Sequence, residues 1–172
     1  MIDAGNASIL GQNGQMFDDI KLNSLVKLLT EVGPDTRIYL GCDSVRLFKN
    51  NKSMAKFATV CIVHKNGNNG CRIFSNTSYE NDYDLRPNRP KMRMINEAKK
   101  VSELYLQLAP LIDEFPIEIH LDVNTDPTHG SNCAASEAAG YVLGMTGIVP
   151  KLKPDGFAAS YGADGVAHGR AA

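Results

Sequence analysis

Three aspartates each follow a short apolar segment of the chain. Asp43 ends the run RIYLGCD, Asp122 ends IEIHLD, and Asp155 comes directly after KLKP. If the first two segments are neighbouring parallel strands, their carboxyl ends meet at one sheet edge, with the two aspartates roughly 5 Å apart. Carboxylates that close repel each other unless a proton or a cation lies between them, and oxygen ligands favour Mg²⁺ or Mn²⁺. The spacing therefore predicts a divalent-metal site, although each aspartate alone is equally typical of a turn or a helix cap.

A fourth carboxylate lies within an apolar helical pattern. In MRMINEAKKVSELYLQL, Glu97 falls on the same stripe as Met94 and Val101. A carboxylate beside an apolar stripe destabilises a fold unless it is paired or binds a metal. Glu97 is therefore a candidate metal ligand, and an ion pair with the flanking Arg93 or Lys100 is the alternative.

The segment that follows Asp122 contains two further polar candidates. Asn124 ends the predicted strand and His129 lies in the loop TDPTHGS that follows it. Either could orient water or relay a proton, since loops near strand ends often carry function. A solvated loop histidine is the alternative for His129. By contrast, His120 shares the polar face of its strand with Glu118 and is expected to be a buried histidine with satisfied hydrogen bonds.

Six of the 18 basic residues lie between positions 86 and 100, where Glu97 alone opposes them. Clustered cations beside carboxylates predict a surface that holds phosphate groups, whereas a solvated charged face is the alternative. The candidate substrate-binding residues in this segment are Arg86, Arg89, Lys91, Arg93 and Lys100.

Length and composition exclude several classes of protein. A chain of 172 residues suits one domain, and a net charge of −1 excludes a polycation that coats nucleic acid by bulk charge. No apolar run reaches the roughly 18–20 residues of a membrane span, and the first residues lack a secretory pattern, so a cytoplasmic location is expected. The four cysteines have no CxxC spacing and are expected to be free thiols rather than zinc ligands.

These residues need a mixed α/β framework to position them. Residues 1–17 are expected to be a flexible lead-in, residues 18–165 a single domain and residues 166–172 a frayed tail. The hydrophobic periodicity predicts a helix after Asp18, a helix over 91–110 that ends at Pro110, and a helix after Ser131. Strands are predicted over 37–44, 56–65, 71–79, 116–124 and 147–154. The NGNNG turn makes the second and third antiparallel, and a helical crossover makes the fourth parallel to the first.

Four stretches, YLGCDS, RMINEAKK, HLDVNTDP and YVLGM…KPDGFAASY, resemble the YkuK-like family, a bacterial branch of the ribonuclease H-like superfamily. The resemblance covers roughly residues 35–163. It implies a five-stranded mixed sheet in the order 3-2-1-4-5, with helices on both faces and acidic residues that bind two divalent ions. Position by position, it assigns those acidic places to Asp43, Glu97, Asp122 and Asp155, with Glu103 as the alternative on the helix.

The resulting hypothesis is a nuclease that hydrolyses nucleic-acid phosphodiester bonds with two Mg²⁺ or Mn²⁺ ions roughly 3.5–4 Å apart. Asp43 would bridge the ions, because it ends the central strand. Two other functions stay open. One is a catalytically silent module of the same fold that binds nucleic acid or protein. The other is a metal-dependent phosphoesterase acting on nucleotides, which needs no long basic surface.

Overall fold

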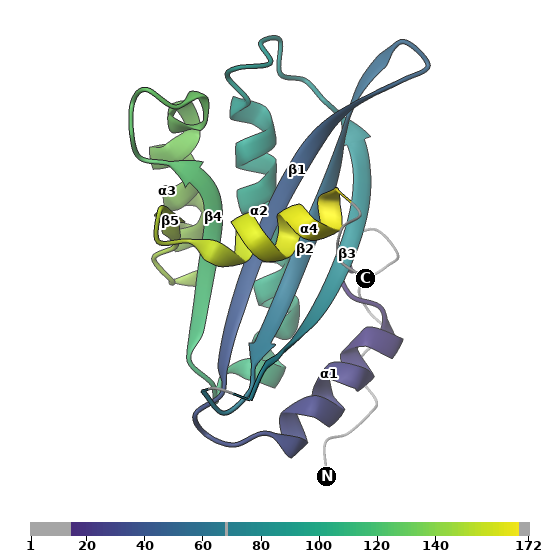
Figure 1. Cartoon of the computed structure of the whole chain (residues 1–172), viewed down its shortest axis with the longest axis vertical. Coiled ribbons are helices and arrows are strands. Elements are labelled where there is room, and N and C mark those ends of the chain that lie inside the picture. Colours follow the sequence, from purple (N-terminus) through teal and green to yellow (C-terminus); the bar gives the residue numbers. More distant parts are fainter. Residues whose placement is uncertain (1–14, 68, 169–172) are drawn as a thin grey trace.

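The computed structural model describes residues 15–67 and 69–168, which form a five-stranded sheet with helices on both faces (Figure 1). The 3₁₀ turn η1 precedes α3, and the π-helical turn η2 precedes α4. In chain order the elements are α1 (Asp19–Glu31), β1 (Arg37–Lys49), β2 (Lys52–His64), β3 (Cys71–Asn81), α2 (Lys91–Ile112), β4 (Ile117–Asn124), η1 (Gly130–Ala134), α3 (Ala135–Thr146), β5 (Lys151–Lys153), η2 (Ala158–Ala163) and α4 (Asp164–Ala167).

The sheet has the order β3-β2-β1-β4-β5. β1 pairs antiparallel with β2, and β2 pairs antiparallel with β3. β4 lies parallel to β1 on its other side, and β5 lies parallel to β4. The predicted fold class and strand order are confirmed, and the parallel pairing of β1 with β4 ends at Cys42 and Leu121, so that the residues after these two positions are neighbours.

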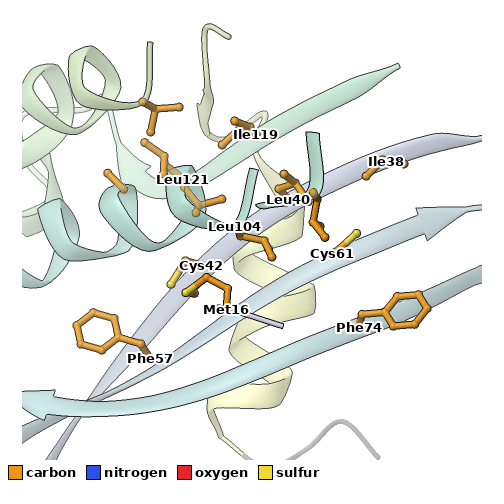
Figure 2. Packing of buried hydrophobic residues seen from close by; sticks show 14 of the residues in the cluster. Met16, Ile38, Leu40, Cys42, Phe57, Cys61, Phe74, Leu104, Ile119 and Leu121 are labelled. Carbon is orange, nitrogen blue, oxygen red and sulfur yellow. The ribbon is translucent and has the colours of Figure 1, made fainter. Parts of the chain in front are cut away.

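One face of the sheet packs against α2 and α3 through large apolar side chains. Ile38 and Leu40 of β1 and Ile119 of β4 are fully buried on this face, together with Leu104 of α2 (Figure 2). Burying side chains of this size contributes roughly 1.5–3 kcal/mol each, so this layer holds most of the apolar core.

The opposite face is covered by η2 and α4, the yellow segment that crosses in front of the sheet in Figure 1 while α2 lies behind it. Its contacts with the sheet are made mainly by small residues, among them Ala158 and Ala163. A Cβ at Gly41 of β1 would lie 2.7 Å from the backbone nitrogen of Ala159. Glycine at this position therefore allows the backbone of η2 to lie directly on the sheet.

Several element boundaries differ from the predicted ones. β1 and β2 are longer than expected, because the polar segment between them is an extended hairpin that turns only at Asn50 and Asn51, both with positive φ. α2 continues through Pro110 to Ile112, so the proline does not end it. β5 contains three residues rather than the expected eight, and the helical region after position 131 begins with η1.

The chain packs against the domain before α1 begins. Phe17 is fully buried, and Gln107 of α2 accepts a hydrogen bond from its backbone nitrogen and donates one to its backbone oxygen, at 2.8 and 2.7 Å. The end of the expected lead-in thus belongs to the core, while residues 1–14 lie outside the described residues. At the other end, Ala167 is buried on the sheet, and the tail beyond residue 168 is likewise outside them. None of the described helices is both long and apolar enough to cross a membrane.

Candidate functional site

Asp43 and Asp122 follow the last paired residues of the parallel strands β1 and β4, Cys42 and Leu121. Asp43 is only 6% exposed, and the Ser44 backbone N–H donates to its Oδ1 at 2.7 Å. Burial and then the charge of Asp122 raise the pKa of Asp43 to about 7, against the lowering effect of the Ser44 hydrogen bond. The structure thus brings the first two predicted carboxylates together, at the cost of mutual repulsion.

Glu97 approaches the same place from α2. It is fully buried, and the Ser44 hydroxyl donates to its Oε1 at 2.6 Å, while its buried Oε2 has no hydrogen-bond partner. Burial, followed by the charge of Asp43, raises the pKa of Glu97 well above its usual value, and Asp122 adds to the effect. Glu97 is thus held by the residue that follows Asp43. Neither alternative ion pair forms, since Arg93 pairs with Asp82 and Asp84, and Lys100 pairs with Glu80.

The two acidic residues that follow β5 lie in different surroundings. Asp155 is exposed in the turn after β5, where its charge acts on Lys151. Asp164 begins α4, and its charge helps to raise the pKa of Asp43. The charge of His168, which pairs with Asp164, lowers the pKa of Asp43. Asp164 was not among the residues that sequence reasoning selected. We refer to Asp43, Glu97, Asp122 and Asp164 as the acidic centre.

Lys153 of β5 also enters the acidic centre. Its Nζ lies 2.5 Å from Oδ1 of Asp122. Burial alone would lower the pKa of Lys153, but the hydrogen bond to Asp122 and the charges of Asp122, Asp43 and Asp164 outweigh it and raise this pKa. No pattern in the sequence predicts this contact, because it depends on the placement of the three-residue strand β5.

A polar network connects the acidic centre to the loop between β3 and α2. Arg93 Nη1 donates to the backbone oxygen and to the hydroxyl of Ser44, both at 3.1 Å. The Arg93 guanidinium also lies beside the buried carboxylates of Asp82 and Asp84, and Arg46 of β1 donates to Asp82. Ser44, which holds Glu97, is therefore fixed in turn by this network.

The predicted basic surface is divided by these ion pairs. Arg93 and Lys100 have side chains only 13% and 9% exposed. Lys100 binds Glu80 and lies 5.0 Å from the centre of the Phe57 ring. Both cations stabilise the interior and do not lie on the expected substrate surface. The carboxylates that pair with these two cations are Glu80, Asp82 and Asp84. They lie just before residues 86–100, the segment in which Glu97 is the only acidic residue.

The remaining three cations stay at the surface. Arg86, Arg89 and Lys91 line a shallow hollow of about 390 Å³ next to Tyr83 and Met92. The Lys91 ammonium lies 2.6 Å from the carboxylate of Glu137 on α3, so it is partly neutralised.

The auxiliary candidates lie at the end of β4 and in the loop that follows it. The Asn124 side-chain oxygen accepts from the backbone nitrogen of Asp126 at 2.8 Å and so shapes the loop. His129 is exposed and lines a second hollow that shares Arg89 with the first. His120 is fully buried, as expected: its Nδ1 accepts from the backbone nitrogen of Ala158 at 3.0 Å, and its Nε2 lies 3.0 Å from Glu118.

The chemistry of the acidic centre fits a divalent cation. All four groups offer oxygen ligands, and the buried Oε2 of Glu97 lacks a partner. As the side chains stand, however, no three His, Cys, Asp or Glu residues in the described part of the chain are close enough to hold an ion together. The carboxylates would therefore have to close around an ion that binds.

Comparison with known proteins gives one family. Neither the curated proteins nor the solved structures include a significant match. The family model described as "Ribonuclease H-like" matches residues 19–168, which include every strand of the sheet and the whole acidic centre. The chain therefore belongs to the ribonuclease H-like family.

Proposed function

We propose that the protein is a divalent-metal-dependent nuclease that hydrolyses phosphodiester bonds of nucleic acid, and that it belongs to the YkuK-like branch of its family. The observation that carries this proposal is the placement of Asp43 and Asp122 directly after the last paired residues of β1 and β4, with Glu97 held by Ser44, the residue next to Asp43. The charges of Asp43 and Asp122 act on Glu97, and that of Asp122 acts on Asp43. A fold that buries repelling carboxylates sacrifices stability, and such perturbed groups cluster at functional sites.

Asp43 lies in the central strand, directly after its last residue paired with β4, and is the candidate ligand shared between two Mg²⁺ or Mn²⁺ ions. Asp122 and Glu97 are the candidate ligands of one ion. For the other ion we place Asp164 rather than Asp155, because the charge of Asp164 acts on Asp43. Bound ions of this kind activate the attacking water and stabilise the leaving 3′-oxygen.

The chain's own groups prepare this site. The Ser44 hydroxyl orients Glu97, and Arg93 orients Ser44. Asn124 shapes the loop that holds His129, which we keep as the candidate for moving a proton. We assign the nucleic-acid backbone to the exposed cations Arg86 and Arg89, with Lys91 beside them, since phosphate contacts position a nucleic acid without reading its bases.

The test is cleavage of labelled RNA, DNA and RNA–DNA hybrid in Mn²⁺ and in Mg²⁺. Asp43→Asn should remove cleavage of whichever substrate is cut, because it withdraws the shared ligand while keeping the side-chain shape. Asp126→Asn is the matched control, since Asp126 is an exposed turn former in a nearby loop. Cleavage that persists in Asp43→Asn would refute the assigned site.

The same assay separates the two C-terminal candidates. Asp164→Asn should lose cleavage, whereas Asp155→Asn should retain it. The reverse result would return the fourth position to Asp155.

A second function, a catalytically silent module that binds nucleic acid, is favoured by one observation. The ammonium of Lys153 already neutralises Asp122. A module of this kind should bind RNA or DNA through Arg86 and Arg89 while its melting temperature stays unchanged by Mn²⁺. A metal-dependent nuclease should instead melt at a higher temperature as Mn²⁺ is added.

A further inference from the structure

Two lysines of β5 have carboxylate partners of different kinds. Lys151 Nζ lies 2.7 Å from the carboxylate of Glu118. Glu118 lies near the start of the β1–β4 pairing, whereas Asp122 follows its last paired residue. Lys153 Nζ lies 2.5 Å from Asp122, and the charges of Asp43 and Asp164 also act on it. Lys153 thus interacts with three members of the acidic centre, whereas Lys151 pairs with Glu118, which lies outside it.

The position of Lys153 follows from the sheet. β5 is parallel to β4, and Lys153 is paired in register with Asn124, two residues beyond Asp122. A single positive charge held there reduces the repulsion between Asp122 and Asp43 that the fold otherwise has to bear. The carboxylates can consequently lie close together in a folded chain that has no metal bound.

The contact is also open to exchange. The side chain of Lys153 is 39% exposed and that of Asp122 is 19% exposed, so water reaches this pair. A lysine on a flexible four-carbon stem can leave such a pair at small cost, since partly exposed ion pairs contribute little net stability. The cations Arg93 and Lys100, with side chains only 13% and 9% exposed, lack this freedom.

We propose that Lys153 is the resident cation of the acidic centre and competes with divalent metal for Asp122. Its ammonium group neutralises the carboxylates in the metal-free protein and leaves Asp122 when an ion binds there. The competition weakens metal binding, so the site fills only when Mg²⁺ or Mn²⁺ is abundant or a phosphate substrate accompanies it. This inference deepens the proposed function, in that it concerns regulation of the same site.

The test is calorimetric titration of the full chain with Mn²⁺ alone, without nucleic acid. Lys153→Met keeps an unbranched side chain only one heavy atom shorter than lysine and removes its charge. It should bind Mn²⁺ roughly tenfold more tightly than the unmodified protein, or bind an additional ion, as expected when one charge leaves a partly exposed site. Lys151→Met is the matched control, because it removes a lysine of the same strand whose side chain is 49% exposed against 39% for Lys153, and it should titrate like the unmodified protein.

Lys153→Arg keeps the charge and should titrate no more tightly than the unmodified protein, which guards against the case where Lys153→Met does not fold. Equal Mn²⁺ affinity and stoichiometry in Lys153→Met and the unmodified protein would overturn the proposal, and so would the absence of Mn²⁺ binding in both. Tighter binding in Lys153→Arg than in the unmodified protein would also overturn it.

The outcome is separate from that of the cleavage assay. If Lys153→Met gains Mn²⁺ affinity while no nucleic acid is cut, the competition stands and the nuclease proposal fails. If nucleic acid is cut and Lys153→Met titrates like the unmodified protein, the nuclease proposal stands and the competition fails.

Discussion

The two faces of the sheet are built differently. On the face covered by α2 and α3, large side chains such as Leu40 and Leu104 fill the space between the layers. On the face covered by η2 and α4, alanines lie close to the strands, and Gly41 permits backbone contact. The first face supplies the larger hydrophobic stabilisation, and the second brings a chain segment that carries a carboxylate close to the strand ends.

The acidic centre lies where these two faces meet. Asp43 and Asp122 follow the last paired residues of β1 and β4, Glu97 comes from α2, and Asp164 comes from α4. The centre therefore depends on both layers, although it weakens the fold by bringing like charges together. The two faces should respond differently to substitution, with stability following the first and the geometry of the centre following the second.

The largest expected effect on stability is on the α2 face. Leu104→Ala removes a fully buried side chain and should lower the free energy of unfolding by about 2–5 kcal/mol in urea denaturation. Leu106→Ala, on the same helix with Leu106 47% exposed, should cost much less. Equal losses in the two variants would contradict the placement of α2 against the sheet.

The next effect concerns the charge cost of the centre. The pKa of Asp43 is about 7 in the folded protein, against the ordinary value of 3.8, so the folded state binds more protons between these values. The stability that this carboxyl contributes is complete below the lower value and is lost as the pH rises through about 7.

Asp43→Asn should therefore flatten the pH dependence of the free energy of unfolding. In the metal-free protein, its effect on this free energy should be more stabilising at pH 8 than at pH 4, by roughly 1–4 kcal/mol. Urea denaturation at several pH values measures this change. Asp35→Asn, in an exposed turn, is the control and should leave the pH dependence as it is. A parallel pH profile for Asp43→Asn would show that Asp43 titrates in the ordinary range.

The third effect tests the close contact on the opposite face. Gly41→Ala places a Cβ 2.7 Å from the Ala159 nitrogen and should displace η2 from the sheet, at a cost of about 1–3 kcal/mol. Because η2 leads into Asp164, the variant should also lose metal-dependent cleavage. Gly144→Ala in α3 has open space around its Cβ and should gain about 0.5–1 kcal/mol, since alanine favours a helix. Unchanged stability and cleavage in Gly41→Ala would argue against backbone contact on this face.

The smallest effect concerns the link between α2 and the strand end. Ser44→Ala removes the donor to Glu97 and should cost about 1 kcal/mol, while the raised pKa of Glu97 should rise further. Thermal unfolding measures the loss. Ser24→Ala is the control, because Ser24 is exposed and bonds only within its own helix, so its change should stay within about 0.5 kcal/mol. A loss of stability no larger than that of Ser24→Ala would show that the hydrogen bond from Ser44 to Glu97 does not stabilise the fold.

The strand order could be predicted because short-range patterns and family motifs both specify it. Boundaries were harder to predict, since the β1–β2 hairpin projects past the core with polar residues that read as a turn. The segment from Asp155 to Ala167 has no clear periodicity, so nothing local indicated that Asp164 would lie beside Asp43. Arg93 and Lys100 were predicted to lie at the surface, because neighbouring positions in the sequence do not reveal that these cations are largely buried and paired with Asp82 and Glu80.

The internal pairing of Arg93 and Lys100 has a consequence for how the protein would respond to salt. Only cations that neutralise phosphates release condensed counterions, and each contributes about −0.9 to the slope of log binding constant against log salt on duplex DNA. The three cations left at the hollow, Arg86, Arg89 and Lys91, would give a slope no steeper than about −3. The affinity for nucleic acid should therefore be modest even at low ionic strength and should fall only gradually as salt is added.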